Sequence, residues 1–160
     1  MYVTRGVLYG CASGSTRRYQ LGNAAACIRT ARAGPVALAG TVVAYGLESC
    51  GVDTGSAVVV VRRLSTGLRL RSLPATTGTL GPESYQRVSS LVVRPDASVA
   101  WIGTASSIIR HTQTIEVHRA DTRGLAELDA GAGIGPSSMR LHGRQVSWHH
   151  DGAVRSAPLL

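Results

Sequence analysis

The hydrophobic positions of this chain fall into short runs that are separated by turn residues. Residues 58–61 (VVVV) are β-branched throughout, and 42–45 and 99–102 form similar runs bounded by Gly, Pro, Asp or Ser. Short runs of this composition are typical of strands. Because no segment shows the apolar spacing of an amphipathic helix, the pattern predicts an all-β protein.

The predicted strands pair into hairpins of two kinds that alternate along the chain. The first kind is a strand, a tight turn and a strand with an aromatic residue near its end; it occurs at 36–47, 90–103 and 138–152. The second kind turns at a glycine; it occurs at 8–22, 58–73 and 115–131. Two hairpins repeating about every 50 residues predict a four-stranded antiparallel unit, with strands a to d, of the size of a β-propeller blade.

The unit boundaries follow from the hairpins. Residues 8–22 supply strands c and d, 36–73 and 90–131 are complete units, and 138–159 supply a, b and a c strand. The 160 residues are thus predicted to form a single domain of about three propeller-type blades, which is an ordinary domain length.

Residues 92–103 (VVRPDASVAWIG) resemble the strand–SPDG–strand motif of TolB-like propeller repeats, and the alternating hairpins resemble WD-repeat propellers. Arg94 stands where the motif has Ser, and Ala97 follows Asp96 where Gly is usual. The chain also looks similar to propeller-like proteins of high-GC actinobacteria. This resemblance implies a propeller-type fold and a secreted or cell-envelope setting, although the N-terminal residues do not form a signal peptide. It implies no activity.

Three assemblies remain open, because propeller rings have about four to eight blades. The chain is a segment of a larger propeller, or half of a ring built from two copies, or an open stack of sheets. In each case the unpaired end strands are predicted sites of self-association, since exposed strand edges pair readily.

The a–b and c–d turns are predicted to be short, whereas the d–a and b–c connections (22–35, 49–56, 74–89 and 103–114) are predicted to be long. We call the side that carries the d–a and b–c connections the loop face. Binding residues favour loops on a rigid scaffold, so we expect any ligand there. The candidate binding residues are Arg29, Arg32, Glu48, Asp53, Glu83, Tyr85, Arg87, Arg110, His111, His149, His150 and Asp151.

Three cysteines lie in the first third of the chain. Cys27 and Cys50 both fall on the loop face, so our preferred prediction is a Cys27–Cys50 disulfide, with Cys11 a buried free thiol; three reduced, buried thiols are the alternative that the sequence leaves open. There is no CxxC pair, and adjacent His149 and His150 would point to opposite sides of a strand. No metal site is therefore predicted, and no cofactor motif is present.

The charge balance bears on the ligand. All 17 basic residues are arginines, against 9 acidic residues, which gives a net charge of +8. The arginines are scattered and aromatic residues are few, which argues against a nucleic-acid surface. Excess arginine favours carboxylates, phosphates or acidic glycans instead. No apolar stretch is long enough to cross a bilayer.

These observations predict a non-catalytic binding module whose ligand or protein partner meets the loop face. The alternative is a glycan-active hydrolase or lyase, which would need two carboxylates, or a histidine and a carboxylate, converging at the channel mouth. The acidic residues placed to do this are Glu48, Asp53, Glu83 and Asp151.

Overall fold

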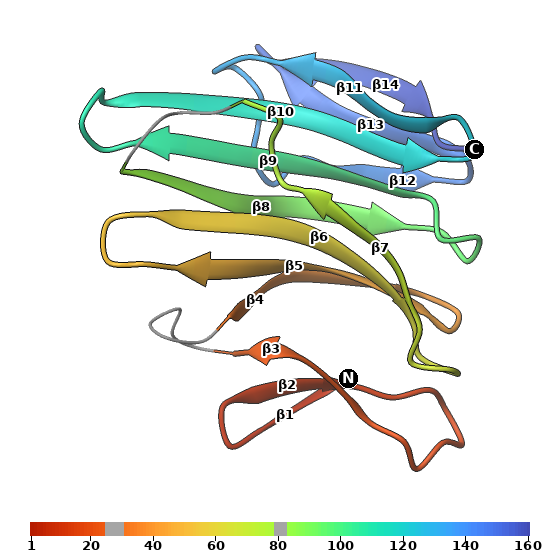
Figure 1. Ribbon diagram of the computed structural model, residues 1–160. Coiled ribbons are helices and arrows are strands. Elements are labelled where there is room, and N and C mark those ends of the chain that lie inside the picture. The colour runs from red at the N-terminus through yellow and green to blue at the C-terminus, as the bar shows by residue number, and fades with distance from the viewer. Residues whose placement is uncertain (25–30, 79–82) are drawn as a thin grey trace.

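The computed structural model describes residues 1–24, 31–78 and 83–160 of the chain. These residues form fourteen strands and no helix, which confirms the predicted all-β class (Figure 1). It follows that no helix in these segments could cross a membrane. The strands are β1 (Tyr2–Thr4), β2 (Val7–Gly10), β3 (Tyr19–Asn23), β4 (Arg32–Ala39), β5 (Val42–Cys50), β6 (Gly55–Arg63), β7 (Arg69–Pro74), β8 (Ser84–Val93), β9 (Val99–Ser107), β10 (Thr112–Asp121), β11 (Gly124–Ala130), β12 (Arg140–His142), β13 (Gln145–His150) and β14 (Ala153–Pro158).

Consecutive strands pair antiparallel in four units. The first unit is β1–β3, the second β4–β7, the third β8–β11 and the fourth β12–β14. A single parallel bridge, Asn23↔Arg32, joins the first unit to the second, and Gly55↔Tyr85 joins the second to the third. Through these bridges β1–β11 form one large mixed sheet, whereas β12–β14 form a separate sheet.

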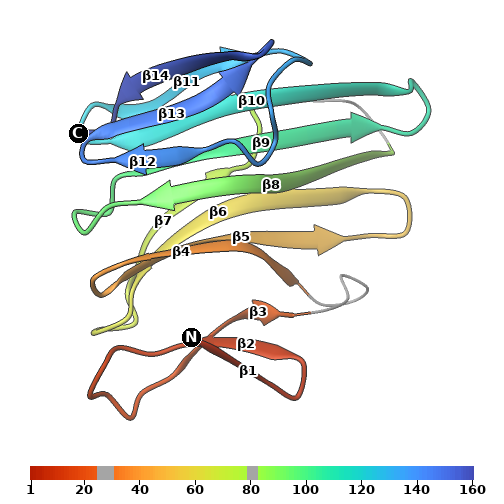
Figure 2. The same ribbon diagram turned by 180° about the vertical axis from the view of Figure 1, so that it is seen from behind.

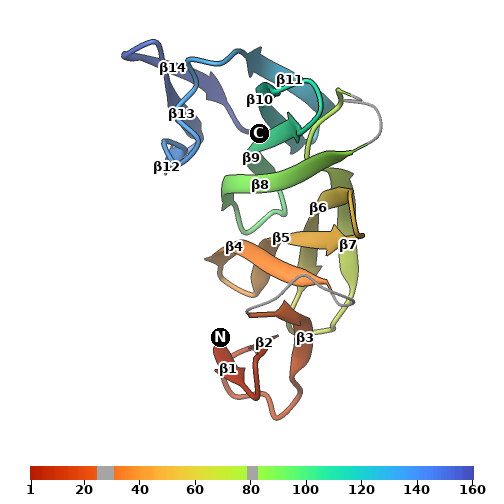
Figure 3. The same cartoon turned by 90° about the vertical axis from the view of Figure 1, so that its left-hand side faces the viewer.

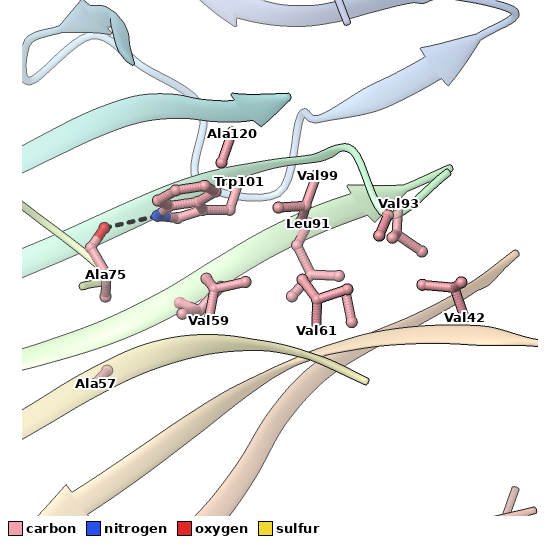
Figure 4. Close-up of a cluster of buried hydrophobic side chains, with 13 residues drawn as sticks. Val42, Ala57, Val59, Val61, Ala75, Leu91, Val93, Val99, Trp101 and Ala120 are labelled. Carbon is pink, nitrogen blue, oxygen red and sulfur yellow. Dashed lines mark hydrogen bonds between the residues drawn. The ribbon is translucent and has the colours of Figure 1, made fainter. Parts of the chain in front are cut away.

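Three hydrophobic cores lie between successive units. On β6, Val59 and Val61 pack toward the third unit, whereas Val58 and Val60 pack toward the first. Alternation along a strand sends neighbouring side chains to opposite faces, so a strand that is apolar throughout is buried on both. Figure 4 shows the core between the second and third units. The VVVV run is therefore explained by a stack of sheets.

The units form an open stack. The N-terminus lies in the first unit, at one end of the stack, and the C-terminus lies beside the third unit, toward the other end (Figures 2 and 3). Within the described segments the sheets close into neither a barrel nor a ring. The C-terminal end is held against the third unit, where Leu160 N–H donates to Asp121 at 3.0 Å and Leu159 is buried.

Strand limits differ from the prediction in two respects. β1 precedes the predicted first hairpin, so the first unit has three strands. The b–c connections, which we expected to be long, are tight turns of two to four residues, because pairing continues past Gly103 to Ser107↔Thr112 and past Ser49 to Cys50↔Gly55. Serine and threonine keep their backbones in the ladder although they interrupt the apolar pattern. The d–a connections are long, and so is the eight-residue β2–β3 connection (11–18), which we expected to be a short c–d turn.

Candidate functional site

The loop face carries the β5–β6, β9–β10 and β13–β14 turns and the β3–β4, β7–β8 and β11–β12 connections. Figure 1 shows the β5–β6 and β9–β10 turns on its left-hand side, with the β4–β5 and β8–β9 turns opposite. A pocket of about 470 Å³ opens between the second and third units near the loop face. Its wall is formed by the beginnings of β4, β6, β8 and β10, the ends of β5 and β9, and Pro136 of the β11–β12 connection. We call it the loop-face pocket; its polar lining residues are Arg32, Glu48, Tyr85, Gln86, Arg87, Ser89, Thr104, Ser106 and Gln113.

Arg32 and Glu48 form an ion pair in the wall of the pocket. They are direct partners in the β4–β5 register, which brings the two side chains together. Arg32 Nη2 lies 2.7 Å from Glu48 Oε2, and Arg32 Nε donates to the same oxygen at 3.0 Å. The Glu48 side chain is 9 % exposed, against 37 % for Arg32. The buried carboxylate is thus neutralised by an arginine that still reaches the open pocket.

Arg87 brings a second positive charge. Its side chain is exposed and forms no hydrogen bond or ion pair with any described residue. It lies on β8 opposite Thr104, whose hydroxyl is 2.7 Å from that of Ser89. Because Glu48 is the only carboxylate among the described lining residues and is paired with Arg32, the lining carries a net positive charge.

Tyr85 fixes one side of the pocket. Its hydroxyl donates to the carbonyl of Val52 at 3.2 Å, which ties the beginning of β8 to the β5–β6 turn. The ring passes so close to Gly55 that a Cβ there would lie 2.8 Å from a ring carbon. Glycine at position 55 is therefore required by the close approach of β8.

Of the predicted binding residues, the structure brings Arg32, Glu48, Tyr85 and Arg87 together in the loop-face pocket. Asp53, Arg110 and His111 are exposed in the β5–β6 and β9–β10 turns and do not line it; Glu83 precedes β8 and does not line it either. His149 and Asp151 are exposed in the fourth unit and do not line the pocket; Pro136, in the connection that leads into this unit, does. Arg29 lies outside the described residues.

A buried polar cluster between the second and third units escaped the sequence analysis. Glu116 accepts hydrogen bonds from the backbone N–H of Thr77 at 2.7 Å and of Gly78 at 3.2 Å, and lies 2.7 Å from His118 Nε2. Burial alone would raise the pKa of Glu116, but these hydrogen bonds and the His118 interaction outweigh it and lower the pKa. The sequence signal was an acid and a histidine two residues apart on a predicted strand, which places both on one face.

Three side chains of this cluster could in principle hold a metal ion, because their potential ligand atoms lie within 4.8 Å of one another. They are Glu116, His118 and Glu127. Both Glu116 oxygens already accept hydrogen bonds from the β7–β8 connection, so their lone pairs are largely used. His118 is stacked on Trp101 with ring centroids 5.2 Å apart. The arrangement suits a structural link between units better than an ion.

A second cluster links the third and fourth units. Asp129 on β11 accepts from Trp148 Nε1 at 2.7 Å and from Arg155 at 2.8 Å, and lies 2.8 Å from His150 Nδ1. Burial opposes ionisation of Asp129, but these partners lower its pKa. His150 is therefore part of a contact between sheets rather than of the pocket.

The cysteines fall into two groups. Cys50 lines the loop-face pocket and is disulfide-bonded. Cys27 lies outside the described residues, so its pairing with Cys50 stays a prediction. Cys11 is free, as expected, but it is half-exposed rather than buried, because it lies beyond the end of β2 where the chain leaves the sheet.

Neither a scan against known protein families nor a search of curated proteins finds a match for this chain.

Proposed function

We propose that this protein is a binding module that holds an acidic, hydroxyl-rich ligand, such as an acidic oligosaccharide, in the loop-face pocket. The main support for the proposal is the state of Arg87, whose exposed guanidinium has no partner among the described residues. The carboxylate in the lining of the same pocket, Glu48, is already paired with Arg32. An anionic group would supply the counter-charge.

The two arginines favour a carboxylate or a similar planar anion. A guanidinium presents its N–H groups as a fork that matches two carboxylate oxygens. Arg87 is free to turn toward the ligand, whereas Arg32 is held in place by Glu48 and offers its remaining N–H groups. The ligand's charge would thus be met mainly by Arg87.

The neutral lining suits hydroxyl groups. Gln86, Gln113 and Ser106 each offer both donors and acceptors at the pocket wall, and Tyr85 adds an aromatic ring. Side chains that both donate and accept match sugar hydroxyls, which do the same. The pocket volume of about 470 Å³ lies in the usual range for small-ligand sites.

The hydrolase alternative finds less support. Hydrolysis by a carboxylate pair needs two acidic groups about 5–10 Å apart on either side of the scissile bond. Of the four acids considered, only Glu48 lines the pocket among the described residues, and it is ion-paired. This favours binding over catalysis.

We also infer that the units are propeller-type blades. The second and third units are four-stranded antiparallel meanders, and the sheets stack face to face. Each inter-unit core also contains one aromatic residue from the second strand of a hairpin of the first kind. These residues are Tyr45, Trp101 and Trp148. In both complete units the third strand is followed by a fourth. β14 has the third-strand position, and its outer edge is unpaired within the described segments. That edge is the proposed place of self-association.

Isothermal titration with trigalacturonate, and with neutral maltotriose as the uncharged comparison, tests the binding proposal. We expect saturable binding of trigalacturonate alone, weakened about 10-fold or more by Arg87→Gln, which removes a charge-assisted contact. Arg144→Gln is the matched control, because Arg144 is exposed in the β12–β13 turn and its side chain has no partner among the described residues. Equal binding by wild type and Arg87→Gln would overturn the proposal.

A further inference from the structure

A second pocket, of about 400 Å³, lies between the first and second units, away from the loop-face pocket. Arg62 on β6 and Arg69 on β7 both line it, together with Gln20, Asn23 and the Tyr45 ring. No acidic residue is among its described lining residues. We call it the two-arginine pocket.

The two arginines are direct partners across the β6–β7 ladder. Like charges directly opposite each other on neighbouring strands are destabilising. The register shifts just before this pair: Val61 is opposite Arg71, and Arg62 is opposite Arg69, which leaves Leu70 as an extra residue on β7. Such a bulge re-aims side chains, and here it places Arg62 opposite Arg69, so that both line the same pocket.

The surrounding chain offers these charges no counter-ion. The sequence contains no Asp or Glu before Glu48 and none between Asp53 and Glu83. Neither Arg62 nor Arg69 forms an ion pair with a described residue. The Arg62 Nε–H is buried without a hydrogen-bond partner. A buried donor left unmatched is costly, so this Nε–H lacks an acceptor in addition to the missing counter-charge.

Arg62 is held in position by aromatic rings. Its guanidinium lies over the Tyr19 ring, 5.7 Å from the centroid. Tyr19 in turn rests on Gly67, where any Cβ would overlap the Tyr19 ring. Burial raises the pKa of Tyr45, and the nearby charges of Arg62 and Arg69 oppose that shift, which agrees with both groups lying close to its phenol. The pocket is thus organised before any ligand enters.

We propose that the two-arginine pocket binds a doubly charged tetrahedral oxyanion, a phosphate or sulfate that is free or borne as a monoester. Two neighbouring guanidinium groups offer a fork of donors to such an anion, and Asn23 and Gln20 add neutral donors at the rim. The anion would relieve the repulsion across the β6–β7 ladder. This site is independent of the ligand proposed for the loop-face pocket.

Titration calorimetry with inorganic phosphate, sulfate and glucose 6-phosphate at constant ionic strength tests the proposal. We expect saturable binding of at least one of them, weakened about 10-fold or more in Arg69→Gln. Tighter binding of glucose 6-phosphate would identify a monoester as the ligand, and equal binding would identify the free anion. Arg69 is exposed, so its replacement should leave the fold intact, which circular dichroism would check.

Arg63→Gln is the matched control. Arg63 is the next residue on β6 and is also exposed, but alternation along the strand directs it to the opposite face from Arg62. Arg87→Gln separates this site from the loop-face pocket. We expect both variants to bind the oxyanion as wild type does. The proposal is overturned if no oxyanion binds saturably, if Arg69→Gln binds as tightly as wild type, or if Arg63→Gln is weakened equally.

Discussion

Trp101 and Trp148 make the same contact in successive units: each donates its indole N–H to the last-strand region of the preceding unit. Trp101 donates to the carbonyl of Ala75, just after β7, at 2.9 Å (Figure 4), and Trp148 donates to Asp129 on β11 at 2.7 Å. Both rings are buried in inter-unit cores. The aromatic residues that recur in the hairpins of the first kind therefore serve packing between units.

Trp101→Phe tests this contact. Phenylalanine keeps most of the apolar ring but leaves the buried Ala75 carbonyl without its indole donor. We expect the free energy of unfolding to fall by about 1–3 kcal/mol. Urea unfolding followed by far-ultraviolet circular dichroism measures it. An unchanged midpoint and slope would show that the indole N–H contributes nothing to the stack.

Gly103→Ala probes how closely the second unit approaches β9. A Cβ at position 103 would overlap the carbonyl of Ala75, a backbone atom that cannot turn aside. We expect a loss of stability of about 1–3 kcal/mol or more, as for an overpacked core. Gly34→Ala serves as the comparison, since its Cβ would meet neighbours only at 3.6 Å and beyond. Equal thermal midpoints for the two variants would contradict the close approach.

Acid should destabilise the protein through its buried carboxylates. The Asp121 carboxylate is fully buried and is bound by Arg123, Arg119 and the Leu160 N–H. Burial alone would raise the pKa of Asp121, but these partners lower it well below the usual range. A carboxyl group with a lowered folded-state pKa contributes stability above its unfolded pKa of about 3.9 and loses it as the pH falls further. The pKa values of Glu116 and Asp129 are also lowered.

We therefore expect the free energy of unfolding to be steady between about pH 7 and pH 5.5 and to fall progressively below about pH 5. Asp121→Asn should be less stable at neutral pH and less sensitive to acid, because its side chain no longer takes up a proton. Urea unfolding at a series of pH values from 7 downward measures the stability of both proteins and how it depends on pH. If the free energy of unfolding of the wild type rose on acidification, the expected direction of the pH dependence would be wrong.

The disulfide prediction can be tested by mass spectrometry. Alkylation of the unreduced, denatured protein should add one group, at Cys11, and a peptide digest should contain Cys27 linked to Cys50. We expect Cys50→Ser to lower the free energy of unfolding by about 2–4 kcal/mol. A digest in which Cys27 is alkylated without reduction would contradict the pairing.

The sequence predicted where the hairpins lie better than it predicted where their strands begin and end. The β-branched run at 58–61 and the glycine turns placed the strands of the two central units. β1 was missed because it is three exposed residues long. The last residues of β9 and the first residues of β10 were missed, because Ser106, Ser107 and Thr112 continue the ladder without the apolar alternation that marks a strand.

The candidate site was anticipated in part. Arg32, Glu48, Tyr85 and Arg87 lie at strand ends on one face, which topology alone brings together. The Glu116–His118 cluster was missed, because its character comes from the β7–β8 connection donating to Glu116 from another unit. The two-arginine pocket was missed because it depends on a one-residue shift in register between β6 and β7.

The most direct test of the loop-face proposal is an amide NMR titration of ¹⁵N-labelled protein with trigalacturonate. We predict that the largest saturable shifts fall on Tyr85, Gln86 and Arg87 and on their neighbours Ser106 and Gln113, and that Arg87→Gln raises the ligand concentration at half-saturation about 10-fold or more. Shifts confined to the two-arginine pocket, or no saturable shifts at all, would contradict it.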